Sequence, residues 1–125
     1  CVEACVQDAS EFNPQWEGEM DVVIADVPCS GYGIIRKKPD IRYKDPDTMK
    51  ELPQLQLAIL NNQAAYVKPG GVLMYSTCTL VRRENEGVVE KFLKETIDTY
   101  NEENGEDEEL NKYVKVWKRI KSLFC

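Results

Sequence analysis

Two runs of consecutive apolar residues are the clearest elements in the sequence. The first is Val-Val-Ile-Ala within residues 21–25, and the second is Val-Leu-Met-Tyr within residues 72–76. Short uninterrupted apolar runs of this kind are typical of buried strands in a parallel sheet. A weaker alternation of apolar and polar residues over residues 2–7 predicts a further short strand that ends at Asp8.

Two segments carry apolar residues at helical spacing. In residues 48–67 the pattern repeats every three or four positions, and Pro53 is compatible with a helix only in its first turn. The Lys-Pro-Gly-Gly sequence at residues 68–71 is expected to end this helix and to lead into the second apolar strand. A second helix is expected over about residues 84–97.

The order strand, helix, strand, helix predicts an α/β fold with a parallel sheet flanked by helices. Only about three strands are expected, which is fewer than a free-standing doubly wound sheet usually has. We therefore expect residues 1–100 to be the carboxyl-terminal part of a larger domain. Residues 101–109 are expected to form an acidic linker, and residues 110–125 an amphipathic basic terminal helix.

The formal net charge is −6, but the charges are unevenly distributed. Six acidic side chains lie within residues 102–109. Five basic side chains lie within residues 36–44, namely Arg36, Lys37, Lys38, Arg42 and Lys44. The overall acidity is therefore compatible with a local phosphate-binding surface. An ordinary solvated loop is the alternative interpretation of this basic segment.

Several classes of protein are disfavoured by the composition. No apolar run approaches the roughly 18 residues of a membrane span, and the first ten residues lack the pattern of a signal peptide. Spaced thiols that follow strands are typical of a reducing, cytoplasmic protein, which disfavours a disulfide framework. The chain has five cysteines, no histidine and no C-x-x-C pair, so no metal site is expected. Without histidine, Cys–His and Ser–His catalytic pairs cannot form within this chain.

Two of the cysteines, Cys29 and Cys78, each follow one of the two apolar runs. Because the carboxyl ends of neighbouring parallel strands meet at one crevice, where such folds bind ligands, we expect both thiols to share one site. The carboxylate of Asp26 should lie at the same place. The alternative is that these cysteines are small buried apolar side chains without reactivity.

A series of short motifs follows in a fixed order between residues 21 and 93. They are Asp-x-Pro-Cys-Ser at 26–30, Gly-Ile-Ile-Arg-Lys-Lys-Pro-Asp at 33–40, Leu-Gln and Ile-Leu within 55–60, Lys-Pro-Gly-Gly at 68–71, Ser-Thr-Cys-Thr at 76–79 and Glu-Asn-Glu at 84–86. In this order and spacing, the segment resembles the Sun (Fmu, or Nop/Sun) family of S-adenosylmethionine-dependent RNA cytosine-carbon-5 methyltransferases. It is most similar to the bacterial branch that acts on small-subunit ribosomal RNA.

The resemblance implies a partial Rossmann-like methyltransferase fold whose first strands are missing, because the family's glycine-rich cofactor loop is absent. It also implies that Cys78 is the nucleophile that adds to carbon-6 of cytosine, and that Cys29 assists breakdown of the covalent adduct. DNA cytosine methyltransferases use the cysteine of the Pro-Cys motif for this attack, so Cys29 is the alternative nucleophile.

The implied cofactor is S-adenosylmethionine, with Asp8 and Asp26 as candidate binding residues. Asp8 matches the family position that contacts adenosine, and Asp26 is placed to bind the amino acid portion of the cofactor or the polar edge of the base. RNA is the expected partner of the basic side chains Arg36, Lys37, Lys38 and Arg42, and ribosomal RNA is the favoured kind. A companion polypeptide or an N-terminal segment is expected to complete the domain. The main alternative is a non-catalytic remnant or RNA-binding module that lacks the cofactor-binding half.

Overall fold

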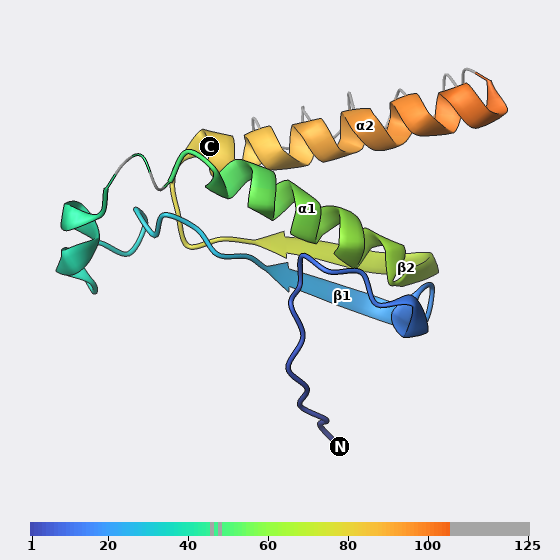
Figure 1. Ribbon diagram of the computed structural model, residues 1–125, viewed down its shortest axis with the longest axis horizontal. Helices are drawn as coiled ribbons and strands as arrows, with labels where there is room; N and C mark the ends of the chain where they lie inside the picture. Colours follow the sequence, from blue (N-terminus) through green and yellow to red (C-terminus); the bar gives the residue numbers. More distant parts are fainter. Residues whose placement is uncertain (46, 48, 106–125) are drawn as a thin grey trace. The chain divides into compact units, whose positions relative to one another are not determined.

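A computed structural model describes residues 1–45, 47 and 49–105 of the chain. Along the sequence these residues form η1 (Pro14–Trp16), β1 (Met20–Asp26), η2 (Pro39–Tyr43), α1 (Leu52–Ala65), β2 (Val67–Ser76), η3 (Arg82–Glu84) and α2 (Glu86–Asn104) (Figure 1). The chain divides into two compact units, residues 1–88 and residues 89–125. Both strands, α1 and every candidate site residue belong to the first unit.

The strands β1 and β2 pair in parallel, as the sequence predicts, with Val23 opposite Leu73 and Asp26 opposite Ser76. The register is irregular at the start of the pair, where the partner of Met20 is Val67. The predicted second strand begins only at residue 72, whereas β2 begins at Val67. The Lys-Pro-Gly-Gly segment at residues 68–71 is therefore an irregular part of β2.

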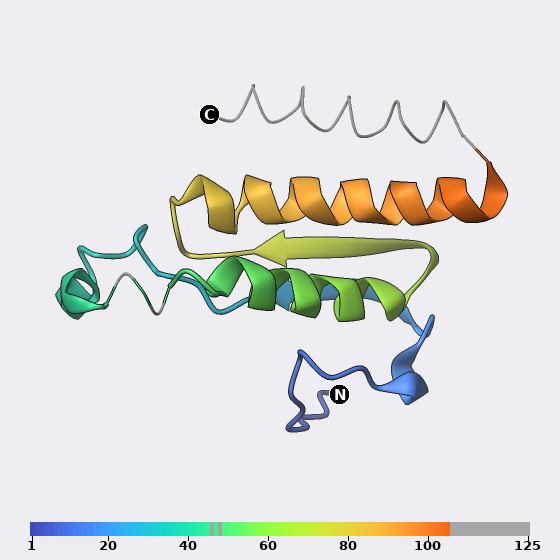
Figure 2. The ribbon, with the colours of Figure 1, turned by 45° about the horizontal axis from the view of Figure 1, so that its top comes forward.

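Helix α1 connects the two strands and packs against both of them, as Figures 1 and 2 show. On β1, Val23 and Ala25 are buried on this face, and on α1 the apolar residues Leu57 and Leu60 are buried. Pro53 lies in the first turn of the helix, where its missing N–H has no intrahelical partner to lose. The predicted strand–helix–strand unit is thereby confirmed.

The opposite face of the sheet is apolar and exposed. Val22 pairs with Val72 and Ile24 pairs with Met74, and the exposed fractions of these four residues are 59%, 56%, 58% and 48%. Parallel sheets are almost always covered on both faces. The expectation of buried strands therefore holds for only one face within the described part of the chain.

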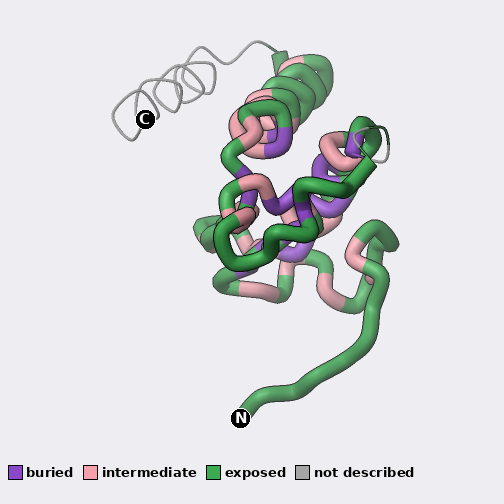
Figure 3. Tube along the Cα trace, turned by 90° about the vertical axis from the view of Figure 1, so that its left-hand side faces the viewer, coloured by how far each residue is buried: buried purple, intermediate pink, exposed green. Residues whose placement is uncertain are grey.

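The strand predicted at residues 2–7 is wrong, because residues 1–8 adopt no helix or strand. Val2 and Val6 are fully exposed, and Figure 3 shows the whole N-terminal stretch as exposed. A strand is stabilised by ladder hydrogen bonds to a neighbour, and these residues have no neighbouring strand in the part that the structure describes. Weak alternation alone did not specify a strand here.

Helix α2 runs further than the predicted residues 84–97, because its bounds are Glu86 and Asn104. The first four residues of the proposed acidic linker are thus helical. Side-chain pairing such as Lys91 with Glu95 supports an exposed helix of this composition. Most of the predicted linker and the terminal helix at 110–125 lie outside the described residues. Within the described ranges, no helix has the length and apolar character needed to cross a membrane.

Candidate active site

The two cysteines of interest lie just beyond the carboxyl ends of the paired strands. Cys29 follows Asp26, the last residue of β1, and Cys78 follows Ser76, the last residue of β2. Their Sγ atoms are 3.0 Å apart. Cys78 is exposed and Cys29 is half-buried. Residues that are 49 positions apart in sequence thus form one thiol pair, as the parallel arrangement predicts.

Three further hydrogen bonds join the loop of Cys29 to the loop of Cys78. The Cys78 backbone N–H donates to Cys29 Sγ over 3.3 Å, and the Gly33 N–H donates to the Cys78 carbonyl over 3.1 Å. The Ser30 and Thr79 hydroxyls, both buried, are 2.7 Å apart. A Cβ atom at position 33 would lie 2.7 Å from the Cys78 carbonyl oxygen, so this close approach requires glycine.

Glu84 is fully buried next to the Cys29 loop. Its Oε2 accepts the Ser30 N–H over 2.8 Å and the Gln56 side-chain amide over 3.3 Å. The same Gln56 amide donates to the Pro28 carbonyl over 2.8 Å. Within the described residues, Glu84 Oε1 and Gln56 Oε1 are buried without a hydrogen-bond partner.

Asn85 forms hydrogen bonds with the loop of Cys78. The Thr77 hydroxyl donates to Asn85 Oδ1, and Asn85 Nδ2 donates to the carbonyls of Thr79, over 2.8 Å, and Val81, over 3.4 Å. Sequence reasoning used Glu84 and Asn85 only as part of a family motif and gave them no role in the site. Their position in the Glu-Asn-Glu motif was the only signal that marked them.

The pKa of the Cys78 thiol is raised. The largest cause is its hydrogen bond with Cys29, followed by partial desolvation and by the electrostatic effects of Cys29 and Asp26. The protonated form of Cys78 is therefore favoured when the site is free. Burial also raises the pKa of the Tyr75 phenol far above its ordinary value, so Tyr75 stays protonated and donates to the Glu84 carbonyl over 2.7 Å.

The two carboxylates proposed to bind the cofactor are placed differently. Asp26 is exposed at the end of β1, on the sheet face that α1 leaves open, and its charge acts on Cys78. Asp8 is exposed and accepts both the Ser10 N–H, over 2.8 Å, and the Ser10 hydroxyl, over 2.6 Å. These hydrogen bonds lower the Asp8 pKa and form a local turn. The preceding strand that was expected to deliver Asp8 to the site is not present.

Asp8 and the cysteines also lie beside different positions along the axis of α1. Asn62 of α1 donates to the carbonyl of Ala9, whereas Gln56 contacts the Cys29 loop. These helix residues are six positions apart, which corresponds to roughly 9 Å along an α-helix. The structure thus brings together Cys29, Cys78 and Asp26 but does not bring Asp8 into the same cluster.

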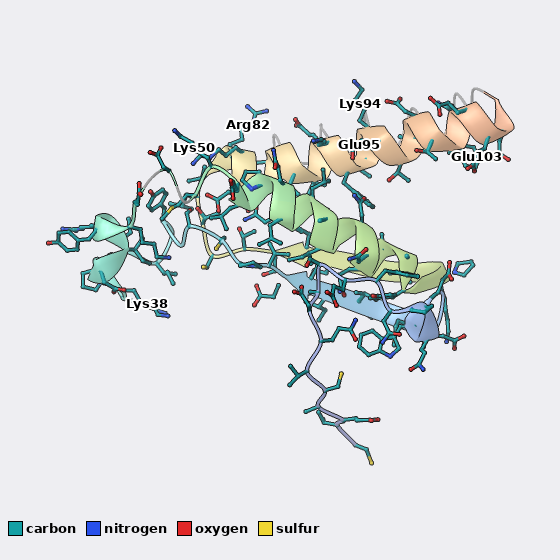
Figure 4. All side chains as sticks on the ribbon, in the orientation of Figure 1. Lys38, Lys50, Arg82, Lys94, Glu95 and Glu103 are labelled. Carbon is teal, nitrogen blue, oxygen red and sulfur yellow. The ribbon has the colours of Figure 1, made fainter. Side chains whose placement is uncertain are left out.

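The candidate RNA-binding residues lie on the segment that follows Cys29. Arg36, Lys37, Lys38 and Arg42 are all exposed. Ile41 of η2 is buried, and its side chain approaches Gly31, where a Cβ atom would meet Ile41 Cδ1 at 3.0 Å. This contact anchors the basic segment two residues from Cys29. Figure 1 shows η2 beyond the arrowheads of both strands, and Figure 4 labels Lys38 in that region.

Among the described residues, no group of three or more His, Cys, Asp or Glu side chains is arranged to hold a metal ion.

Comparison with known proteins identifies clear relatives. The family described as 16S rRNA methyltransferase RsmB/F matches residues 2–121. The probable ribosomal RNA small subunit methyltransferase B of Bacillus subtilis (strain 168) is 44% identical over 99 residues, which are 78% of this chain and 22% of that protein. The ribosomal RNA small subunit methyltransferase B of Xylella fastidiosa (strain 9a5c) is 36% identical over 104 residues, or 82% of this chain and 25% of that protein.

A solved structure, described as the crystal structure of PH0851, has a similar fold. It superposes with a TM-score of 0.69 at 38% sequence identity and covers 74% of this chain and 21% of its own. The chain thus spans about a quarter or less of the length of each of these relatives. The α/β fold is a partial Rossmann-like methyltransferase fold, in agreement with the sequence analysis.

Proposed function

Since the chain belongs to the 16S rRNA methyltransferase RsmB/F family, we propose that it carries the catalytic cysteines of an enzyme that methylates carbon-5 of a cytosine in ribosomal RNA. The observation that carries this proposal is the contact between Cys29 and Cys78 at the carboxyl ends of the parallel strands. Carbon-5 of cytosine is a poor nucleophile. A thiolate that adds to carbon-6 makes carbon-5 enamine-like, so covalent catalysis divides one difficult step into easier ones.

Cys78 is the proposed nucleophile because it is an exposed residue, whereas Cys29 is half-buried. Attack requires the thiolate, and the raised Cys78 pKa means that its proton has to leave first. Cys29, 3.0 Å away, can accept that proton when its own sulfur is a thiolate, and it then releases the proton to solvent. The Cys78 sulfur then bonds to carbon-6.

Cys29 is the proposed residue that assists the breakdown of the adduct. Once carbon-5 carries the methyl group, it must lose its proton before the ring double bond re-forms and the bond between Cys78 and carbon-6 breaks. In its thiolate form, Cys29 lies beside Cys78 to take the carbon-5 proton, and Cys78 leaves carbon-6 as a thiolate when the double bond re-forms. Hydrogen bonds from the Cys78 N–H and between the two loops keep the sulfurs in this arrangement.

S-adenosylmethionine would supply the methyl group, which is attached to the positively charged sulfur of the cofactor. The free carboxylate of Asp26 fits the amino acid portion of such a cofactor, since it is exposed beside the cysteines. Asp8 is proposed for the adenosine portion, although its carboxylate is engaged by Ser10 in this structure. The exposed sheet face of Val22, Ile24, Val72 and Met74 supports the proposal that a companion polypeptide or further segment completes the domain.

A trapped covalent adduct tests the nucleophile. The rest of the fold can be supplied by a chimera in which this chain replaces the matching segment of the Bacillus subtilis protein. With RNA that contains 5-fluorocytosine, carbon-5 cannot lose a proton, so an adduct should persist in denaturing gels. We expect the adduct with the wild-type chimera and with Cys29→Ala, but none with Cys78→Ala.

Two results would change the proposal. An adduct in Cys78→Ala together with its loss in Cys29→Ala would make Cys29 the nucleophile. If the wild-type chimera forms no adduct while the unaltered Bacillus protein does, the chain is a non-catalytic remnant or RNA-binding module. The incomplete sheet is the observation that favours this second candidate function.

A further inference from the structure

We propose that the adjacent residues Glu84 and Asn85 are positioning residues of the two-cysteine site, each fixing one of the two cysteine loops. Glu84 holds the loop of Cys29, and Asn85 holds the loop of Cys78. Because the two residues are neighbours in the chain, a single dipeptide sets how closely the two sulfurs approach. This inference rests on the proposed function and adds to it the residues that set the geometry.

The contact of Glu84 with the Cys29 loop is made to the backbone. Glu84 Oε2 accepts the N–H of Ser30, the residue that follows Cys29, over 2.8 Å. Gln56 of α1 bridges the same carboxyl oxygen and the carbonyl of Pro28, the residue that precedes Cys29. The peptide groups on both sides of Cys29 are therefore fixed by a buried pair of side chains.

The contacts of Asn85 hold the Cys78 loop in the same way from the other side. Its amide group accepts from the Thr77 hydroxyl and donates to the Thr79 carbonyl, so it engages the residues that precede and follow Cys78. The amide also donates to the Val81 carbonyl, which ties the loop to the start of η3.

The burial of Glu84 argues that its role is more than general stability. Burying a carboxyl group with one unpartnered oxygen costs folding free energy that an apolar side chain of similar size would not cost. What it provides is a fixed acceptor for a backbone N–H that would otherwise be buried without a partner. Tyr75 fixes the backbone of Glu84 in turn, by donating to its carbonyl.

Neither residue contacts the sulfurs directly through its side chain in the hydrogen bonds described, so both act through the loops. Small displacements of the two loops have large effects on reactivity, because the reacting sulfurs must be held in one orientation. Loss of either contact is expected to increase the average separation of Cys29 Sγ and Cys78 Sγ.

The effective concentration of one thiol at the other measures this separation directly. In a background in which Cys1, Cys5 and Cys125 are serine, the chain is equilibrated with mixtures of oxidised and reduced glutathione. The two protein thiols lose two electrons and two protons to form a disulfide, and one glutathione disulfide is reduced to two thiols. The equilibrium constant gives the effective concentration, and circular dichroism follows folding separately.

We expect Asn85→Ala and Glu84→Ala each to lower the effective concentration by about tenfold or more. Glu84→Gln keeps an oxygen acceptor for the Ser30 N–H and should stay within about threefold of the parent chain. Matched controls are Asn61→Ala on the exposed side of α1 and Glu103→Ala on α2, labelled in Figure 4, and both should leave the value unchanged.

A milder pair of variants covers the case in which the alanine variants do not fold. Thr77→Val removes the hydroxyl that donates to Asn85 at nearly constant volume, whereas Thr77→Ser retains it. The proposal requires Thr77→Val to lower the effective concentration and Thr77→Ser to preserve it. Equal values for both, or a folded Asn85→Ala chain with the parent value, would overturn it. Because the assay needs neither RNA nor cofactor, its outcome is independent of whether the chimera methylates RNA.

Discussion

At the scale of single residues, the chemistry that we propose depends on the Cys78 sulfur, which lies 3.0 Å from the Cys29 sulfur. A thiol becomes nucleophilic by ionising, yet the hydrogen bond with Cys29, partial desolvation and the Asp26 charge all favour the protonated form of Cys78. Cys29 therefore has two opposing effects in our proposal. It raises the Cys78 pKa, and as a thiolate it can accept the Cys78 proton.

The first of these effects gives a prediction about pH. Replacing Cys29 by alanine removes the largest cause of the raised pKa, so the Cys78 pKa should fall toward that of an ordinary thiol. The rate of alkylation of Cys78 by iodoacetamide, followed by peptide mass spectrometry against pH, should reach its midpoint at a lower pH in Cys29→Ala than in the parent chain. A profile that stays in place or moves to higher pH contradicts the described hydrogen bond.

Sequence reasoning found the residues proposed to react but not the residues that hold them. Cys29, Cys78 and Asp26 are recognisable because each stands at the end of an apolar run, and strand ends converge in a parallel sheet. Glu84 and Gln56 are polar residues in segments that look amphipathic, and nothing local shows that they are fully buried. Their burial depends on a loop that is 28 or more residues away in sequence.

At the scale of elements, α1 is what ties the site to the fold. It buries one face of the sheet through residues such as Leu57 and Leu60, and through Gln56 it reaches the Cys29 loop. The helix therefore links the apolar core to the geometry of the thiols.

This packing predicts the cost of truncating the helix. Leu60 is 2% exposed, so Leu60→Ala should lower the free energy of unfolding by about 2–5 kcal/mol, through lost burial and the cavity that remains. Leu55 lies on the same helix but is 39% exposed, and Leu55→Ala should cost markedly less. Urea unfolding followed by circular dichroism provides both values, and similar costs for the two variants would contradict this packing.

The basic segment around η2 is a second element with a testable role. If Arg36, Lys37, Lys38 and Arg42 contact phosphates, replacing all four by alanine should weaken RNA binding and reduce its salt dependence. The slope of log affinity against log salt should fall by about 0.7 for each lost contact with single-stranded RNA. Fluorescence anisotropy with labelled RNA measures both quantities.

A charge-matched comparison separates a local effect from a general one. Lys37→Ala should weaken binding, whereas Lys94→Ala on α2, which removes the same charge elsewhere, should have little effect. Equal losses in the two variants would indicate that only the net charge matters and would remove the argument for a binding surface on this segment.

At the scale of the whole molecule, the sheet is the feature that stands out. Two parallel strands are described, one face is covered by α1, and the other presents Val22, Ile24, Val72 and Met74. The matched segment covers 22% and 25% of two relatives, so each of these proteins is at least four times as long as the segment.

This incompleteness leads to a prediction about the cofactor. Of the two candidate binding residues, only Asp26 presents a free carboxylate at the site, so the 125-residue chain alone should not bind S-adenosylmethionine measurably in a calorimetric titration. The chimera with the Bacillus protein should bind it. Saturable binding by the chain alone would show that its own residues suffice and that no further segment is required.

The sequence by itself determined the local elements and the positions of the two cysteines at the ends of the strands. Apolar runs, helical spacing and a proline confined to a first turn specified β1, α1 and β2, because these signals depend only on neighbouring residues. They also placed both cysteines at strand ends. The strand expected at residues 2–7 failed for the complementary reason, since a strand needs a partner that local sequence cannot supply.

Only the tertiary structure decided the distances. That Cys29 and Cys78 are in contact, that Glu84 is buried beneath Ser30, and that one apolar sheet face is exposed all depend on pairing between distant segments. Register and burial are set by the sum of many long-range contacts, whereas a sequence pattern reports only which face of an element is apolar.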